Sequence, residues 1–215
     1  MSRLDEATRA LLAVAAALND AAEDALTPLM REARAAGSSA TWLEELVLEA
    51  VLFVGFPRAL VAAVALRQVE PTSGDPGDAA DYSRWRDWLA RGEDTCRRIY
   101  GANYDRLRRN VVALHPALDA RIVMDGYGRA ISRPGLDLKR RELCAIAMLV
   151  AQGVPHQLHS HLRGALNAGV APEEVDETLD IAARAAGAPK PRTQAARRLW
   201  AELWPSAVSP QQSEG

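Results

Sequence analysis

The sequence predicts an all-α protein, and three observations support this. Aromatic residues make up only 5% of the 215 residues, β-branched residues are sparse, and alanine, leucine and arginine dominate. Apolar residues recur with helical spacing, and glycine and proline divide the chain into segments of helical length. Because alanine, leucine and arginine favour helices whereas β-branched and aromatic residues favour strands, we expect helices throughout.

The first two-fifths of the chain are predicted to hold one helical unit and a linker. Residues 4–69 are expected to form three helices, the third of which stops at Gly55-Phe56-Pro57. Residues 70–81 contain two prolines and two glycines and are predicted to be a flexible linker. The helices that follow are expected at about 82–100, 103–114 and 117–129.

The C-terminal part is predicted to begin with a helix that Asp137 caps and that stops near Gly153-Val154-Pro155. A second helix runs from about 156 to 167 and ends at Gly169, a residue suited to a left-handed C-cap. A third begins at Pro172-Glu173-Glu174, where proline and early acidic residues suit a helix N-terminus, and a last helix runs through residue 200. The polar tail, residues 206–215, is expected to be disordered.

The two ends of the chain resemble each other, which indicates an internal duplication. When Leu4 is placed on Leu136, an offset of 132 residues, no gap is needed over residues 4–69 and 136–201. The matches least expected by chance are Gly37 with Gly169, Gly55 with Gly187 and Pro57 with Pro189. We therefore predict a degenerate N-terminal repeat over 1–69, a linker over 70–81, a C-terminal domain over 82–205 and a tail over 206–215.

Charge and hydropathy exclude several classes of protein. The formal net charge is −2, which gives no electrostatic reason to expect nucleic acid as a partner. The N-terminus lacks the pattern of a signal peptide, and no run approaches the roughly 18 apolar residues of a membrane span, because Glu49 interrupts the longest run. Cys96 and Cys144 form no motif. We expect a cytoplasmic protein that does not bind membranes.

A carboxylate and a histidine carry the predicted chemistry. Glu142 lies among apolar residues of its helix, and His161 lies one turn after Gln157 on the next. Two antiparallel helices can bring Glu142 against His161, and a carboxylate–imidazole pair in apolar surroundings can move protons near neutral pH. The corresponding N-terminal positions hold Ala10 and Leu29, which predicts one working site and one structural half.

Other kinds of site have weaker support. His156, His159 and His161 do not share one helix face, and no second ligand cluster with metal-site spacing occurs, so no metal is expected. No serine lies in a Gly-x-Ser-x-Gly turn, and there is no glycine-rich phosphate loop.

At these residues the chain resembles the carboxymuconolactone decarboxylase family, over roughly residues 91–199. The resemblance rests on the stretches 127–136, 141–143 and 161–170 and on the acidic opening 172–175. It implies an all-α, alkyl hydroperoxidase D-like fold, a homo-oligomer that is a trimer or hexamer, and no cofactor. The related hydroperoxidases carry a Cys-x-x-Cys pair at positions that here hold Val154 and Gln157, so this chain falls on the decarboxylase side.

The resemblance implies roles for individual residues in decarboxylation of, or proton transfer on, a small carboxylated lactone or related oxo acid. His161 would transfer the proton or stabilise the oxyanion, and Glu142 would orient it. His156 would be an auxiliary donor. The expected substrate-binding residues are Arg133, Arg163, Gln157 and Tyr127.

Two alternatives from other classes stay open. One is a catalytically retired scaffold or binding protein that keeps the oligomer. The other is a redox or antioxidant protein that uses Cys96 or Cys144 in an unconventional way.

Overall fold

The computed structural model describes residues 4–72, 74–185 and 190–204, and these residues form helices and no strand, which confirms the all-α prediction. The predicted N-terminal helices are α1 (Glu6–Ala17), α2 (Glu23–Ala35) and α3 (Ala40–Arg67). The middle of the chain forms α4 (Trp85–Tyr100), α5 (Tyr104–Leu114), α6 (Pro116–Arg121) and the π-helical segment η4 (Ile122–Ile131). The last elements are α7 (Leu138–Gln152), α8 (Pro155–Asn167), α9 (Pro172–Ala185) and α10 (Lys190–Leu203).

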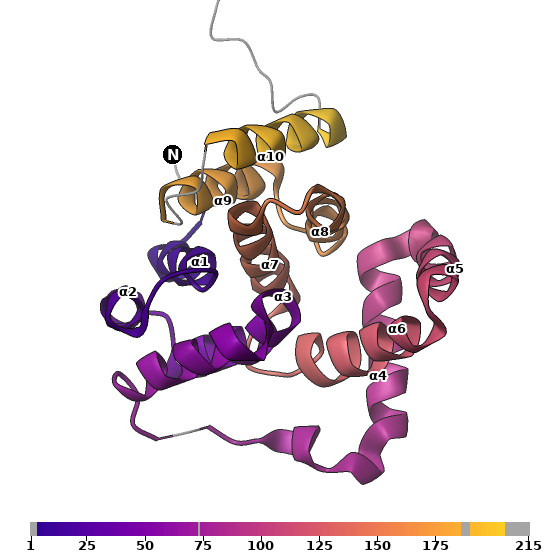
Figure 1. Cartoon of the computed structure of the whole chain (residues 1–215), viewed down its shortest axis with the longest axis horizontal. Coiled ribbons are helices and arrows are strands. Elements are labelled where there is room, and N and C mark those ends of the chain that lie inside the picture. Colours follow the sequence, from indigo (N-terminus) through magenta and orange to yellow (C-terminus); the bar gives the residue numbers. More distant parts are fainter. Residues whose placement is uncertain (1–3, 73, 186–189, 205–215) are drawn as a thin grey trace, which may run out of the picture.

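Helix α7 lies in the middle of the larger part of the molecule (Figure 1). Helices α1 and α8 flank it, α9 and α10 lie across one end, and α3 passes across the other (Figure 1). One hydrophobic core joins α1, α2 and α3 to the four C-terminal helices. Every residue of α7 from Arg141 to Ala151 is buried, which explains why its sequence is apolar around most of its circumference.

Helices α4, α5 and α6 and segment η4 form a lobe beside this core (Figure 1). The lobe has a small core of its own, which includes Cys96, Ile99 and Tyr127. Its two long elements touch backbone to backbone: a Cβ at Gly92 would lie 2.0 Å from the Val123 carbonyl oxygen, and one at Gly128 would lie 1.9 Å from that of Trp88. Only glycine fits at these two positions.

One expected element differs in detail. The sequence predicts a single helix over 117–129, whereas the chain forms the short α6 and then the wider turns of η4. Segment η4 contains Gly126 and Gly128, and glycine is the residue that favours the α-helix least after proline.

The segment predicted as a linker is held by side chains of the neighbouring elements. It contains the short 3-10 helix η1 (Gly77–Ala80). Asp78 pairs with Arg91 at 2.6 Å, and the Ala79 carbonyl oxygen accepts a hydrogen bond from Arg129 at 2.7 Å. These contacts tie the linker to the lobe.

The helix bounds repeat at the offset of 132 residues. Helix α2 at this offset coincides with α8, and the first residues of α1 and α3 coincide with those of α7 and α9. Gly37 and Gly169 both have positive φ, at 102° and 85°. Gly187 and Pro189, on which the predicted duplication also rests, and the tail 206–215 lie outside the described residues.

One arginine arrangement also repeats at this offset. Arg141 Nε donates to the Leu136 carbonyl oxygen at 3.1 Å, and its Nη2 pairs with Glu45 at 2.7 Å. Arg9 Nη1 donates to the Leu4 carbonyl oxygen at 2.9 Å and pairs with Glu177 at 3.4 Å. Each arginine therefore contacts a glutamate of the other unit. The duplication itself stays a prediction.

Helix α3 is apolar and long enough to span a membrane by length and composition, with a window of mean hydropathy 2.0. This differs from the expectation from sequence, in which Glu49 interrupts the apolar run. The helix is broken at Gly55, where φ is 75°, and its acidic residues Glu45 and Glu49 are buried in ion pairs with arginines. One side of α3 therefore belongs to the core, as in the central helix of many globular proteins.

Candidate active site

The expected pair between Glu142 and His161 is formed. His161 Nδ1 lies 3.0 Å from Glu142 Oε2, and the two residues are 8% and 1% exposed. Glu142 comes from the first half of α7 and His161 from α8. A Cβ at Gly164 would lie 2.7 Å from Glu142 Oε2 and 2.8 Å from Ile99 Cγ2, so Gly164 leaves the space that this carboxylate occupies.

The surroundings of His161 favour its protonated form. Burial by itself would lower the pKa of His161, but the charge of Glu142, their hydrogen bond and the charge of Glu49 together raise it. The Phe53 ring of α3 meets the imidazole edge-on, with 5.3 Å between ring centroids. Because Glu142 holds Nδ1, Nε2 is the ring nitrogen that can face a substrate.

A buried ion-pair network adjoins this pair. Arg141, 1% exposed, donates from Nη1 to Glu49 at 3.0 Å and from Nη2 to Glu45 at 2.7 Å. Glu45 also pairs with Arg133 at 3.0 Å. The network connects α3 of the N-terminal unit to α7, which carries Glu142.

Glu49 has the most perturbed carboxyl group of this network. Burial and, to a smaller extent, the charge of Glu142 raise its pKa from 4.5 to about 7, although Arg141 and His161 partly offset the effect. Glu49 Oε1 is buried and has no hydrogen-bond partner among the described residues. A carboxyl group in this state exchanges protons near neutral pH.

This shift predicts how stability depends on pH. Glu49 keeps its proton in the folded protein up to about pH 7 but loses it near pH 4.5 in the unfolded chain. Stability from this proton is complete below pH 4.5 and is lost as the pH rises to about 7, by roughly 3 kcal/mol. We expect urea unfolding to show this decline in the wild type and a flatter curve in Glu49→Gln. Equal slopes in both proteins would contradict the assignment.

Three aspartates with a lowered pKa affect the stability of the protein in a more acidic pH range. Salt bridges and helix caps lower the pKa of Asp5, Asp78 and Asp137 below 3.8 against the effect of burial. Their contribution is lost only as the pH falls below that value, so the two windows do not overlap.

Two tyrosines lie near Glu142. The hydroxyl groups of Tyr100 and Tyr127 are 2.7 Å apart, and both phenol groups interact electrostatically with Glu142. Burial raises the pKa of both tyrosines, so they stay neutral hydrogen-bond donors at physiological pH. Tyr127 was a predicted substrate-binding residue, and Tyr100 is its partner from α4.

The other predicted site residues lie apart from the pair. His156, Gln157 and Arg163 are exposed on α8. Arg163 is two residues after His161, which places it on the opposite side of the helix. Arg133 is already engaged by Glu45 and by the Pro76 carbonyl oxygen at 3.0 Å. Within this chain the structure therefore brings together Glu142, His161 and Tyr127, whereas these four residues form no hydrogen bond or ion pair with Glu142 or His161 among the described residues.

Both cysteines are buried and free. Burial raises the pKa of Cys96 to about 12 and that of Cys144 well above its ordinary value. Neither thiol forms the thiolate that redox chemistry requires at neutral pH. This disfavours the redox alternative.

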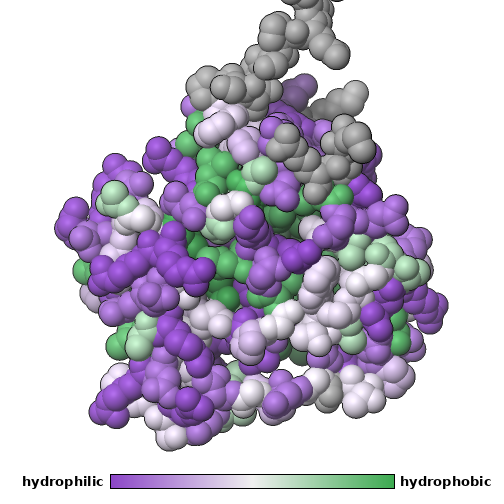
Figure 2. Space-filling model, turned by 180° about the vertical axis from the view of Figure 1, so that it is seen from behind, coloured by the Kyte–Doolittle hydropathy of each residue, from purple (hydrophilic) through white to green (hydrophobic). Residues whose placement is uncertain are grey.

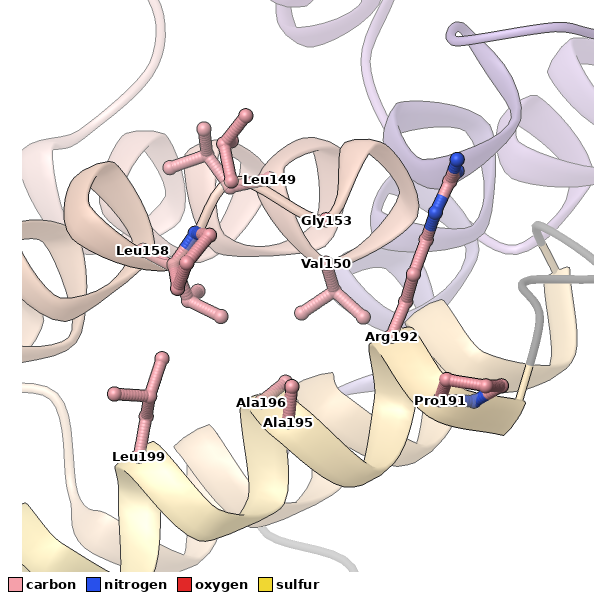
Figure 3. Close-up of a pocket in the computed structure, with 11 residues that line it drawn as sticks. Leu149, Val150, Gly153, Leu158, Pro191, Arg192, Ala195, Ala196 and Leu199 are labelled. Atoms are coloured by element: carbon pink, nitrogen blue, oxygen red, sulfur yellow. The ribbon is translucent and has the colours of Figure 1, made fainter.

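An apolar pocket lies between the end of α7, the start of α8 and helix α10, with a volume of about 210 Å³. Leu149, Val150 and Leu158 lie on one side and Ala195, Ala196 and Leu199 on the other, while the Arg192 side chain extends past the end of α7 (Figure 3). On the face opposite to Figure 1, hydrophobic residues gather in the middle and hydrophilic ones surround them (Figure 2).

The side chain of Phe53 lies between His161 and a second, more polar pocket of about 270 Å³. Phe53 lines this pocket together with Arg58 and Arg192, and it also contacts the His161 ring. Neither Glu142 nor His161 lines either pocket. Arg58 donates to the Leu18 carbonyl oxygen at 3.0 Å and Arg192 to that of Ala151 at 2.7 Å, so both arginines also cap helix ends.

The sequence missed several residues around the pair, namely Glu45, Glu49, Phe53, Tyr100 and Arg141. One signal was present: Glu49 stands alone within the longest apolar run. A charged residue kept within an apolar run is either paired or functional, because a lone buried charge is costly. For Phe53 and Tyr100 no comparable signal exists.

Comparison with known proteins gives partial matches. Residues 119–202 match the carboxymuconolactone decarboxylase family. A 4-carboxymuconolactone decarboxylase of Acinetobacter baylyi is 40% identical over 63 residues, which are 29% of this chain and 47% of the relative. A nitrosuccinic acid decarboxylase of Metarhizium robertsii is 38% identical over 63 residues, 29% of this chain and 44% of the relative. The match thus spans less than half of the length of these relatives.

Proposed function

We propose that this chain catalyses cofactor-independent decarboxylation of a small carboxylated lactone or related oxo acid. The match of residues 119–202 to the carboxymuconolactone decarboxylase family supports this proposal. The observation that carries the proposal is the buried pair of Glu142 and His161, 3.0 Å apart. Both relatives are named for the loss of carbon dioxide from a small acid, which supports the same reaction type here.

The reaction needs an electron sink and a proton. When the bond from carbon to the carboxylate breaks, its electron pair moves into the neighbouring carbonyl as an enolate, and carbon dioxide leaves. The enolate carbon then takes a proton. The protein must supply hydrogen-bond donors to the oxyanion and a proton donor to carbon.

The residues of the cluster suit these tasks. The raised pKa of His161 keeps its imidazole protonated to a higher pH, and Nε2–H is the donor that can reach the enolate carbon. Glu142 fixes the ring through Nδ1 and stabilises the imidazolium. The neutral hydroxyl groups of Tyr100 and Tyr127 are candidate donors to the oxyanion.

The means of holding the substrate carboxylate is a separate proposal. The predicted residues Arg133, Arg163, Gln157 and His156 stay predictions, since Arg133 is engaged and the other three are exposed away from the pair. Arg58, Arg192 and Phe53 line the second pocket, and Phe53 also contacts the His161 ring. Arginine is the side chain best suited to a carboxylate, which supports a role for this pocket.

The direct test is release of carbon dioxide from 4-carboxymuconolactone by the purified protein, with His161→Ala beside it. Turnover by the wild type that is lost in the variant supports both the reaction and the site. Absence of turnover with this compound, with other lactones and with β-keto acids would contradict the proposed reaction. The retired scaffold would then be the better interpretation.

We also propose that the chain forms a homo-oligomer, a trimer or hexamer as its resemblance to the family implies. An exposed apolar stripe on α3 supports this. It consists of residues at every fourth position, each between 41% and 68% exposed: Leu48, Leu52, Phe56, Leu60 and Val64. Several large apolar side chains exposed on one element are typical of a contact with another protein. The cytoplasmic location stays a prediction.

Introducing charge into the stripe should dissociate the oligomer. We expect Phe56→Asp combined with Leu60→Asp to reduce the mass measured by light scattering to that of one chain, because two charges would be buried in the contact. Leu114→Asp, at a residue of α5 that is 78% exposed and outside the stripe, is the control and should leave the mass unchanged. An unchanged mass in the double variant would place the contact elsewhere.

A further inference from the structure

The N-terminal unit places a carboxyl group beside the proposed active site. Glu49 of α3 is 1% exposed, and one turn later on the same helix Phe53 contacts the His161 ring. Glu49 Oε2 accepts a hydrogen bond from Arg141 Nη1 at 3.0 Å, while the buried Oε1 has no partner among the described residues. Glu49 interacts electrostatically with both Glu142 and His161.

The charges of the buried cluster do not balance without a proton. Its acidic groups are Glu45 and Glu49 on α3 and Glu142 on α7. Its permanent cations are Arg141 on α7 and Arg133 after η4. Three carboxylates thus face two guanidinium groups, and one further proton makes the cluster neutral. A buried cluster with unbalanced charge is strongly disfavoured, so that proton is retained.

Two groups compete for this proton. One is the imidazole of His161 on α8, held by Glu142. The other is Glu49, whose pKa burial raises to about 7, and whose remaining neighbour Cys144 on α7 stays an uncharged thiol. When His161 is protonated Glu49 can be ionised, and when His161 is neutral the proton can reside on Glu49.

Glu49 has no acidic counterpart in the C-terminal helices, unlike Glu45. The ion pair of Arg141 with Glu45 has a counterpart at the offset of 132 residues in that of Arg9 with Glu177. Glu49 has none, because Ile181 occupies the corresponding position. Glu142 and His161 likewise correspond to the apolar Ala10 and Leu29. Glu49 therefore follows the pattern of the site residues, not that of the structural ion pair.

We propose that Glu49 is a positioning residue of the active site that shares one proton with His161 and thereby returns the imidazole to its protonated form after each turnover. This rests on the proposed function. In the reaction, His161 gives its Nε2 proton to the enolate carbon and becomes neutral. Solvent then supplies one proton to the Glu49 carboxylate, and Glu49 gives this proton up as the imidazole takes one, so one proton is consumed for each carbon dioxide released.

The test is the titration of His161 followed by NMR in protein labelled at histidine, compared with Glu49→Gln. Glutamine keeps the volume and the acceptor for Arg141 but cannot ionise. Four histidines are present, and His161→Ala identifies the signal. In the wild type we expect His161 to titrate in two coupled steps. In Glu49→Gln we expect one step at lower pH, because the negative neighbour is gone. Glu177→Gln, at the counterpart of Glu45, should leave the His161 titration unchanged.

Activity adds a second readout where a substrate is known. We expect kcat of Glu49→Gln to fall about tenfold or more with KM changed less than threefold, and the alkaline limb of the kcat profile to move to lower pH. Equal His161 titration in Glu49→Gln and the wild type would overturn the proposal, and so would an unchanged pH profile.

Two further outcomes distinguish failure of the proposed proton sharing from failure of the proposed decarboxylation. A coupled titration in a protein without decarboxylase activity would support proton sharing while the proposed reaction fails. If Glu49→Gln does not fold, the wild type decides by itself: a single-step titration of His161 overturns the proposal. Glu49→Asp, which keeps an ionisable group, is expected to retain two steps.

Discussion

His161→Ala is expected to lower kcat for decarboxylation by about 10²- to 10⁴-fold, the usual contribution of a positioned proton donor. The imidazole supplies the proton to carbon. Glu142 cannot take over this role, because its carboxylate is bound to Nδ1, whereas the proton is given from Nε2. Glu142→Gln keeps the volume but removes the charge that raises the pKa of His161, so kcat should fall and the pH profile should move to lower pH.

The matched control for this prediction is His159→Ala. His159 lies on the same helix two residues before His161 and takes no part in the buried pair. Its activity should stay within twofold of the wild type, and circular dichroism should show all three variants folded. Full activity in folded His161→Ala and Glu142→Gln would remove both residues from the mechanism.

Arg141→Met is expected to lower the free energy of unfolding by about 3 to 5 kcal/mol. Arg141 is 1% exposed and pairs with Glu45 and Glu49, which are 4% and 1% exposed. Methionine fits an apolar core but leaves two buried carboxylates without their shared partner. Urea unfolding at pH 7 measures the loss, which should decrease as the pH falls, because protonation of the carboxyl groups removes the unpaired charge.

Arg9→Met is the control at the corresponding position of the N-terminal unit. The Arg9 side chain is 33% exposed and its pair with Glu177 is longer, at 3.4 Å, so solvent screens the interaction. We expect a loss of about 1 kcal/mol or less. Similar losses in both variants would show that burial of the Arg141 network does not matter for stability.

Both the N-terminal and the C-terminal helices contribute residues to the candidate site, which the sequence alone did not suggest. The C-terminal unit supplies Glu142 and His161, as predicted. The N-terminal unit was expected to be the structural half, yet its helix α3 brings Glu49 and Phe53 to the pair. The N-terminal helices therefore contribute side chains beside the pair although they lack a Glu–His pair at the corresponding positions.

The sequence by itself determined the helices and the central pair. Helix bounds follow from local signals. Asp137 caps α7, and its side chain accepts a hydrogen bond from the Arg140 amide at 3.1 Å. Gly153 and Gly169, which both adopt positive φ, follow the ends of α7 and α8. The pair of Glu142 and His161 was predictable because two successive helices with a short connection pack against each other.

Only the tertiary structure decided what surrounds the pair. Glu49 and Phe53 come from a helix about a hundred residues earlier, and Tyr100 comes from the lobe. Arg133 was predicted to bind substrate, but the fold places it against Glu45. Helical periodicity tells which side of a helix is buried and not which distant helix covers it. The physical reason is that charge pairing and burial depend on distances between segments, which a local sequence pattern does not contain.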